Sequence, residues 1–202
     1  MSRTVLDMSM SLDGFVTGPH EGPANGLGDG GDQLHEWIFH GRGDHPSDAI
    51  GGSGSVNGRM VDEAMATGAV ITGRGTFEAA TGWGGDHHDG VPIYVLSRNP
   101  APAWAAEWPG VHYVSDLAAA VRDAKDAAGD RNVLVHGASV MLRHGITAGL
   151  LDELEIHVVP VLLGDGRRLF DDLGVGQRRL ELIRVLDGEG GVTHLRYRVG
   201  AP

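Results

Sequence analysis

Short runs of hydrophobic residues, many of them β-branched, recur along the chain, and each is bounded by glycine or polar residues. Such runs predict buried β-strands, because strands in globular proteins are short and end at turn-forming positions. The predicted strands cover residues 4–11, 69–72, 91–97, 111–115, 132–137 and 151–164.

Between these runs, hydrophobic residues return at spacings of three and four, which predicts amphipathic helices. In residues 32–40 the hydrophobic stripe consists of Leu34, Trp37 and Ile38. Further helices are expected over residues 56–67, from Thr76 to Ala80, over 117–128 between an Asp116 cap and a terminating Gly129, and over 139–148.

The order of these elements predicts an α/β fold. Strands that alternate with helices form a mostly parallel central sheet flanked by helices on both faces. Residues 180–187 and 192–199 flank a glycine-rich turn and predict a C-terminal antiparallel hairpin. We expect a single domain over residues 1–202, with loops over 12–31 and 41–54.

Composition limits the classes of function. The formal charge of −11 argues against a nucleic-acid binder, which needs a basic face. The chain has no cysteine, so disulfides and thiolate metal sites are excluded. Adjacent His87 and His88 are expected to point apart and have no further ligand at a convincing spacing, so no metal site is predicted. No signal peptide or long apolar segment is visible, and a cytoplasmic location is expected.

The segment Gly73-Arg74-Gly75-Thr76 stands where a predicted strand passes into a helix. Ligands of parallel sheets bind beyond the carboxyl ends of the strands, where backbone N–H groups can bind an anion. Arg74 could hold a phosphate with two hydrogen bonds, and Thr76 could cap the helix. The alternative is an ordinary turn with a solvent-exposed arginine.

Two further turns at predicted strand ends suit a nucleotide. Gly137-Ala138-Ser139-Val140 combines a glycine with small residues that leave room for a pyrophosphate. Ser97-Arg98 offers a hydroxyl and a guanidinium, which suit the 2′-phosphate that distinguishes NADPH from NADH. Each turn taken alone is also compatible with a purely structural role.

Two loop segments are candidates for the substrate side. Asp13 follows the first predicted strand, where a carboxylate could orient a substrate, although Asp-Gly pairs are most often simple turns. Gly164 lies in a tight loop that also carries Arg167 and Arg168, either of which could meet an anionic group or remain solvated.

Taken in order, these segments resemble the dihydrofolate-reductase-like superfamily, and most closely its branch with the reductase domain of riboflavin biosynthesis. The resemblance covers nearly the whole chain. It rests on SLDG at 11–14, GAVITGRGTFE at 68–78, VPIYVLSR at 91–98, VHGASV at 135–140, LLDEL at 150–154 and PVLLGDGRRLF at 160–170.

The resemblance implies NADPH as cofactor. It assigns Gly73, Arg74 and Thr76, in the turn that also contains Gly75, to the cofactor phosphates and Ser97 with the adjacent Arg98 to the adenosine part. It places the turn from Gly137 to Val140 under the pyrophosphate and nicotinamide, with Gly164 in the same site. The sequence departs from the family pattern at His136, where a first glycine is common, and at Gly75, where a second arginine is common.

The reaction that the resemblance implies is hydride transfer from nicotinamide C4 to a C=N or C=O group. True dihydrofolate reductases carry an acid on the first helix, but here Glu36 lies off the expected pocket-facing stripe and Asp32 suits a cap. Folate is therefore a less favoured substrate. Asp13 is the ionisable group expected nearest the reacting end, and Trp37 is the expected aromatic wall.

The leading hypothesis is a stand-alone NADPH-dependent reductase of a small heterocyclic or carbonyl-type substrate. The alternatives within enzymes are the pyrimidine reductase of riboflavin synthesis and a true dihydrofolate reductase. The alternative from another class is a nucleotide- or ligand-binding protein that keeps the fold without turnover. The resemblance also implies a homodimer, formed through a late strand or the terminal hairpin.

Overall fold

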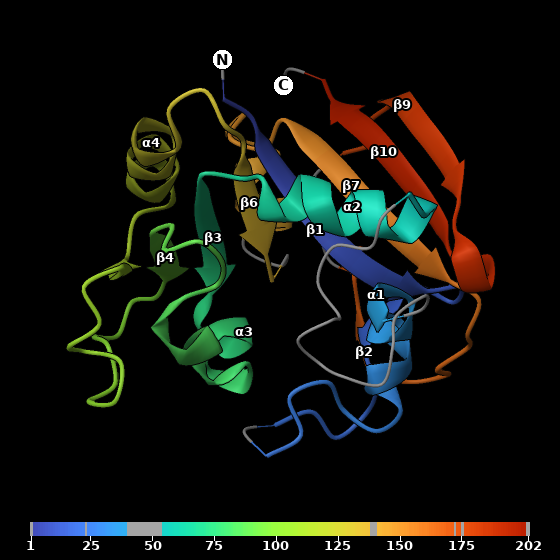
Figure 1. Ribbon diagram of the computed structural model, residues 1–202, viewed down its shortest axis with the longest axis horizontal. Helices are drawn as coiled ribbons and strands as arrows, with labels where there is room; N and C mark the ends of the chain where they lie inside the picture. The colour runs from blue at the N-terminus through green and yellow to red at the C-terminus, as the bar shows by residue number, and fades with distance from the viewer. Residues whose placement is uncertain are drawn as a thin grey trace.

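Eight strands form the central sheet in the order β5-β4-β3-β6-β1-β7-β10-β9 (Figure 1). The computed structural model describes residues 2–22, 24–39, 54–137, 141–171, 173–174 and 176–200. The strands of this sheet are β1 (Thr4–Ser11), β3 (Ala69–Gly73), β4 (Ile93–Leu96), β5 (Val111–Val114), β6 (Val133–His136), β7 (Glu153–Val159), β9 (Leu180–Asp187) and β10 (Thr193–Val199). A small second sheet pairs β2 (Phe15–Thr17) with β8 (Arg167–Arg168).

Four α-helices accompany the sheet in the described part of the chain: α1 (Glu36–Phe39), α2 (Val56–Met65), α3 (Arg74–Ala79) and α4 (Leu117–Ala128). The predicted ends of α4 are confirmed, because the Asp116 side chain accepts a hydrogen bond from Ala119 N at 2.7 Å and Gly129 follows with φ of 61°. Within the described residues, no helix combines the length and the apolar character needed to cross a bilayer.

Strand pairing confirms the predicted α/β fold. β1 runs parallel to both of its neighbours, β6 and β7, and β3 runs parallel to β6 and β4. The carboxyl ends of β4, β3, β6, β1 and β7 therefore lie along one edge of the sheet. β10 pairs antiparallel with β7 and β9, which forms the predicted C-terminal hairpin.

Alternate residues of the central strands pack into two hydrophobic clusters on opposite faces of the sheet. On one face, buried residues of the strands pack against α4, and they include Leu6, Ile71, Val135, Ala120 and Ala124. On the other face, buried strand residues surround Phe77 of α3, and they include Val70, Ile93, Val95 and Leu134. This alternation is the period of two that buried strands require.

The sheet face that packs against α3 becomes polar where α1 and α2 cover β1, β7 and β10. The strand residues beneath these helices are polar or charged rather than apolar, although most are buried. They are Asp7, Ser9, Glu153, Glu155, His157, His194 and Arg196. This polar face positions half of the candidate site.

Several predicted boundaries were wrong. The strand predicted over 151–164 ends at Val159, because Pro160 has no N–H group to continue the ladder. The helix predicted over 32–40 is a 3₁₀ turn, Gly31–His35, followed by one α-helical turn. In the segment predicted as a helix over 139–148, the structure has a π-helical turn, Met141–Gly145, and then turns. The loop predicted over 41–54 lies almost entirely outside the described residues.

Candidate active site

Two of the predicted cofactor turns touch each other at the carboxyl edge of the sheet. Thr72 of β3 lies opposite His136 of β6, so the turns after these strands are neighbours. Gly137 has φ of 74°, and a Cβ atom there would lie 2.3 Å from Thr76 Oγ1 and 3.4 Å from Gly73 N. Glycine is therefore required at position 137 for the two turns to approach each other.

Arg74 opens α3 and lies at the same edge. Its Nε donates to Glu78 Oε1 at 2.7 Å, one helical turn later, which leaves both terminal guanidinium nitrogens outside that ion pair. A Cβ atom at Gly75 would meet no other atom within 4 Å. The backbone of this turn is therefore open to a bound molecule, with a guanidinium beside it.

The predicted turn Ser97-Arg98 lies next to the Gly73–Thr76 turn. Gly73 pairs with Leu96, so Ser97 follows directly beyond the paired ends of β3 and β4. Ser97 Oγ donates to Asn99 O at 2.8 Å and accepts from Asn99 N at 3.0 Å, while Arg98 is exposed. Ala138, Ser139 and Val140, the remainder of the predicted cofactor set, lie outside the described residues.

Asp13 holds the loop after β7 against the end of β1. Its carboxylate accepts hydrogen bonds from Ser11 Oγ at 2.6 Å, Gly164 N at 2.8 Å and Leu163 N at 3.2 Å. The bond from Ser11, followed by those from the loop backbone, holds the pKa of Asp13 below its usual value. A carboxylate bound in this way is a poor proton donor but a good brace for the loop that contains Gly164.

Trp37 is buried, with 5% of its surface exposed. Its Nε1 donates to Ser9 Oγ at 2.9 Å, and its ring lies 4.4 Å from the His157 ring and 5.1 Å from the His194 ring, measured between centroids. Trp37 thus packs against a buried pair of histidines, and its predicted role as an aromatic wall beside the substrate remains a prediction.

That histidine pair belongs to a chain of hydrogen bonds across the polar face. His157 Nε2 lies 3.2 Å from Asp7 Oδ1, His157 Nδ1 lies 2.7 Å from His194 Nδ1, and His194 Nε2 lies 3.0 Å from Asn57 Oδ1. Both histidines are buried, with 1% and 0% of their surface exposed. Burial, and then the neighbouring His157, lowers the pKa of His194 to about 4, so this ring is neutral at pH 7.

Three more histidines converge on Asp7 from other elements. Burial is the main cause that lowers the pKa of His35, of His136 and of His87, the last to about 3. His87 lies against His136, with ring centroids 5.0 Å apart. His87 and His88 do not point apart as predicted, because their Nδ1 atoms are 2.7 Å apart. Among the described residues, no cluster could hold a metal ion.

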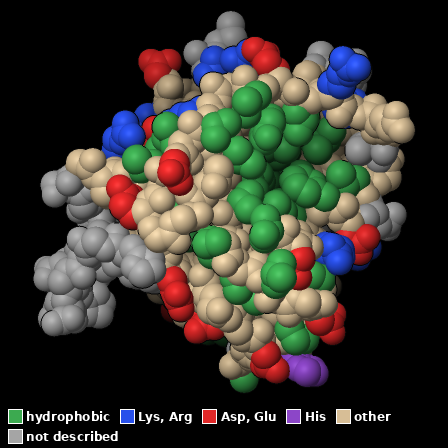
Figure 2. Space-filling model, turned by 90° about the vertical axis from the view of Figure 1, so that its right-hand side faces the viewer, with side chains coloured by type: hydrophobic (Ala, Val, Ile, Leu, Met, Phe, Trp, Pro, Cys, Tyr) green, Lys and Arg blue, Asp and Glu red, His purple; other side chains and the backbone are tan. Residues whose placement is uncertain are grey.

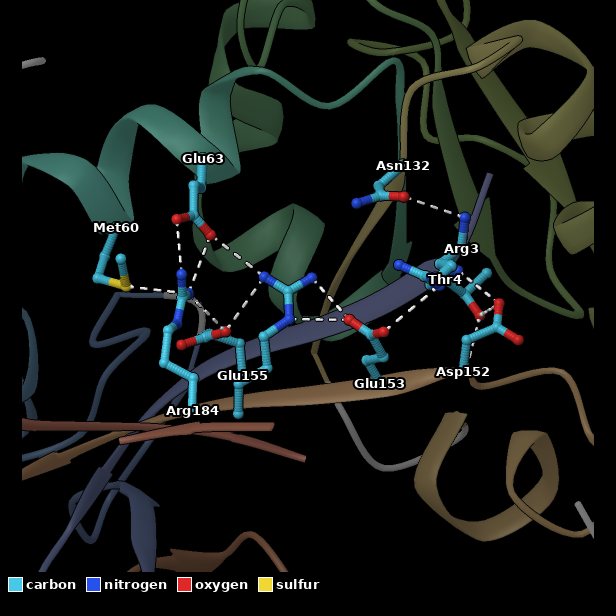
Figure 3. A network of polar contacts seen from close by, with 10 residues as sticks. Arg3, Thr4, Met60, Glu63, Asn132, Asp152, Glu153, Glu155 and Arg184 are labelled. Atoms are coloured by element: carbon cyan, nitrogen blue, oxygen red, sulfur yellow. Dashed lines mark hydrogen bonds and ion pairs between the residues drawn. The ribbon is translucent and has the colours of Figure 1, made fainter. Parts of the chain in front are cut away.

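A cleft of about 310 Å³ runs beneath α2 from Asp7 toward the amino ends of β6 and β3. Four of the charged side chains that line it, Glu63, Glu155, Arg184 and Arg196, pair with one another (Figure 3). Arg184 contacts Glu63 at 2.7 Å and Glu155 at 3.1 Å, and Arg196 contacts Glu63 at 3.2 Å. Burial raises the pKa of Glu155, and within the described residues Glu155 Oε1 and Arg184 Nε have no hydrogen-bond partner. Both atoms are buried, so the charged network beneath α2 leaves one acceptor and one donor without a partner in the described part of the chain.

Comparison with known proteins identifies the family. The family model of the RibD C-terminal domain matches residues 3–193, nearly the whole chain. The chain belongs to the RibD C-terminal domain family. Membership confirms the predicted resemblance to the reductase domain of riboflavin biosynthesis. A search among curated proteins gives no match.

Solved structures share the fold of this RibD C-terminal domain. A protein assigned to riboflavin biosynthesis from Shewanella sp. PV-4 aligns with TM-score 0.69 and 21% identity, covering 99% of each chain. RibD of Acinetobacter baumannii aligns with TM-score 0.59 and 20% identity over 99% of this chain, which spans 58% of that protein. Dihydrofolate reductase of Enterococcus faecalis, solved with NADP(H), aligns with TM-score 0.57 and 16% identity over 97% of this chain and 95% of that one. The dihydrofolate-reductase-like fold is thereby confirmed.

The turns of this RibD C-terminal domain are predictable from the sequence, whereas Asp7, His157, His194 and the cleft were not predicted. A signal was available in β7, where Glu153, Glu155 and His157 alternate with hydrophobic residues. Alternating charges in a strand that helices cover on both faces indicate a buried polar site rather than a solvated face.

Proposed function

We propose that this chain is an NADPH-dependent reductase that transfers hydride to a C=N or C=O bond of a small heterocyclic substrate. The observation that carries the proposal is the contact between Gly137 and the Gly73–Thr76 turn, beyond neighbouring parallel strands. In open α/β sheets, such crevices at the carboxyl ends of strands are where nucleotide ligands bind. Family membership and the fold shared with an NADP(H)-bound dihydrofolate reductase support the same assignment.

The residues present fit this cofactor. Gly75 leaves the backbone accessible, Gly137 lets the two turns approach each other, and the Arg74 terminal nitrogens are available to a phosphate. Ser97 and Arg98, one strand further out, are placed to meet the adenosine 2′-phosphate. The sequence-based assignment of Ala138, Ser139 and Val140 to the same turn remains a prediction.

When bound, the dihydronicotinamide would supply a hydride to the substrate carbon. The protein's own contribution is to orient both molecules and provide a proton. We place the substrate in the cleft beneath α2, whose lining carboxylates and guanidinium groups suit a ring that carries both hydrogen-bond donors and acceptors. The Asp13 carboxylate accepts from Gly164 N and so braces the loop after β7 at the carboxyl end of β1.

The carboxylates of the cleft make folate and pyrimidine rings candidate substrates. No carboxylate of residues 32–38 points into the cleft, but Asp7 and Glu63 do line it. A ring recognised through a carboxylate is therefore chemically compatible. Dihydrofolate and a ribosylamino pyrimidine phosphate both belong in the substrate panel, beside simple imines and ketones.

Cofactor titration tests the proposal. NADPH fluorescence should report a dissociation constant well below roughly 1 mM, the weak end of the affinity scale, with weaker binding of NADH. Arg74→Ala should weaken NADPH binding by about tenfold or more, because a charge-assisted bond to phosphate is lost. Arg98→Ala should reduce the preference for NADPH over NADH, and Arg122→Ala, an exposed arginine of α4, is the matched control. Absence of NADPH binding by the unmodified chain would refute the cofactor assignment.

The edge strand β9 supports the expected homodimer. Its exposed hydrophobic side chains are Leu180, Leu182, Ile183 and Val185, and they contribute to the apolar patch on this side of the molecule (Figure 2). An edge strand with unpaired backbone groups and apolar side chains is a ready site for association. We assign this surface to a second copy of the chain.

A further inference from the structure

The hydrogen-bond chain from Asn57 to Asp7 can be followed proton by proton. Asn57 Nδ2 donates to the carbonyl oxygens of Trp37 and Glu189, both at 3.1 Å, so the amide orientation is fixed. Its Oδ1 therefore faces His194 and can only accept a hydrogen bond. His194 Nε2 must carry a proton, and because this ring is neutral, its Nδ1 carries a lone pair.

The next link fixes the proton on His157. His194 Nδ1 accepts, so His157 Nδ1, 2.7 Å away, must donate. A neutral His157 would then present a lone pair on Nε2 to Asp7 Oδ1 at 3.2 Å. Two acceptors at this distance repel each other unless a proton lies between them. The Asp7–His157 pair therefore holds one proton more than an ionised aspartate and a neutral histidine would.

Electrostatics decides where that proton rests. Burial opposes ionisation of Asp7, but the charge and hydrogen bond of His157 outweigh it, and the pKa of Asp7 lies below its usual value. In the resting state the proton is thus on His157, paired with the Asp7 carboxylate. The titratable and charged groups that surround the pair are Glu63 on α2, His136 on β6, Glu155 on β7, Arg184 on β9, His194 and Arg196 on β10, and His35 and His87 from loops.

The pair is placed between the two halves of the site. Asp7 lines the cleft, and its side chain is 16% exposed. Leu6 pairs with Val135, so Asp7 stands beside His136, which directly precedes the Gly137 turn. A ligand in the cleft and a ligand on that turn would therefore meet near Asp7.

We propose that the Asp7–His157 pair is the proton donor of the reductase, with Asp7 the catalytic residue and His157 its proton reservoir. The inference rests on the proposed function. When hydride adds to carbon of the substrate's C=N or C=O bond, the π electron pair would move to nitrogen or oxygen, which would take a proton from Asp7. Because Asp7 is ionised at rest, that proton would pass to its carboxylate from His157 Nε2, and His157 would be reprotonated from solvent after turnover. The net change consumes one hydride and one proton for each bond reduced.

Nitrogen NMR of the histidine side chains tests the proton count in the protein without ligand. At pH 7 the unmodified chain should show His157 protonated on both nitrogens and His194 protonated on Nε2 alone. In Asp7→Asn, the new amide can donate to His157 Nε2, so His157 should become neutral. A neutral His157 in the unmodified chain would overturn the proposal.

Turnover provides the second measurement. On the panel compound that the unmodified chain reduces fastest, Asp7→Asn should lower the rate of NADPH oxidation at least about 100-fold, the usual contribution of a positioned acid. Its melting temperature and NADPH affinity should stay close to those of Asp126→Asn, an exposed aspartate of α4 that serves as control. Retained turnover in Asp7→Asn would overturn the role of the pair. Failure of NADPH binding would instead refute the proposed function. The NMR result is independent of that outcome, because it is measured without cofactor.

Discussion

Acidification should destabilise the folded chain through His194. The ring is buried between β7, β10 and α2, and its pKa is about 4 in the folded chain against the ordinary value of 6.5. The unfolded chain therefore binds this proton more readily than the folded chain. The stabilisation is present above about pH 6.5 and is lost progressively as the pH falls toward 4.

The size of the effect follows from linkage between protonation and folding. With these two pKa values, the folded state loses about 2 kcal/mol between pH 7 and pH 5, and about 3 kcal/mol by pH 4. His87 adds a loss of the same sign, because burial lowers its pKa to about 3. A variant that removes only His194 separates the two contributions.

Urea unfolding, followed by tryptophan fluorescence at pH 7, 6 and 5, measures this loss. His194→Gln should be less stable than the unmodified chain at pH 7, because the ring contact with Trp37 and the Nδ1 acceptor of His157 are lost. The difference between the two proteins should shrink by about 2 kcal/mol at pH 5. His144→Gln, at an exposed histidine, is the control and should follow the unmodified chain. Parallel pH profiles for His194→Gln and the unmodified chain would refute the reasoning.

Two further predictions concern the cofactor turn and the edge strand. Gly137→Ala should lower stability by roughly 1–3 kcal/mol and weaken NADPH binding, because its Cβ would clash with Thr76 and residue 137 has φ of 74°. The control Gly75→Ala should keep the melting temperature of the unmodified chain, because its Cβ would meet nothing within 4 Å. Unchanged stability of Gly137→Ala would contradict the close approach of the turns. Val185→Lys should convert a dimer to a monomer in light scattering, whereas Leu12→Lys, at an exposed site away from β9, should not. A monomeric unmodified chain would exclude the interface on β9.

The elements that the sequence predicts well are those set by local patterns. The strand at 4–11 and the helix at 117–128 have the predicted bounds, because hydrophobic periodicity and the Asp116 cap act over a few neighbouring residues. The predictions fail where contacts between distant segments of the chain determine the structure. The pairing of β2 with β8 joins residues about 150 positions apart, and no local signal marks it.

The same distinction applies to the site. The glycine turn at 73–76 is visible because its signal is contiguous in sequence and its position after a strand is predictable. The Asp7–His157–His194–Asn57 chain joins four elements, and each of these residues taken alone has an ordinary structural explanation. Only the strand register, which sets Asp7 opposite Glu155 and His157 opposite His194, brings them together.

The two faces of the sheet indicate which part of the chain serves chemistry rather than stability. The face against α4 is packed with hydrophobic residues such as Leu6, Ile71 and Val135, so this fold can bury an apolar surface on its central strands. The face beneath α2 instead buries carboxylates, guanidinium groups and imidazoles. Replacing buried ion pairs with hydrophobic residues is often neutral or stabilising, so these groups are not explained by stability. We propose that a proton donor and a polar recognition surface require them, with the substrate on the α2 face and the cofactor at the strand-end turns.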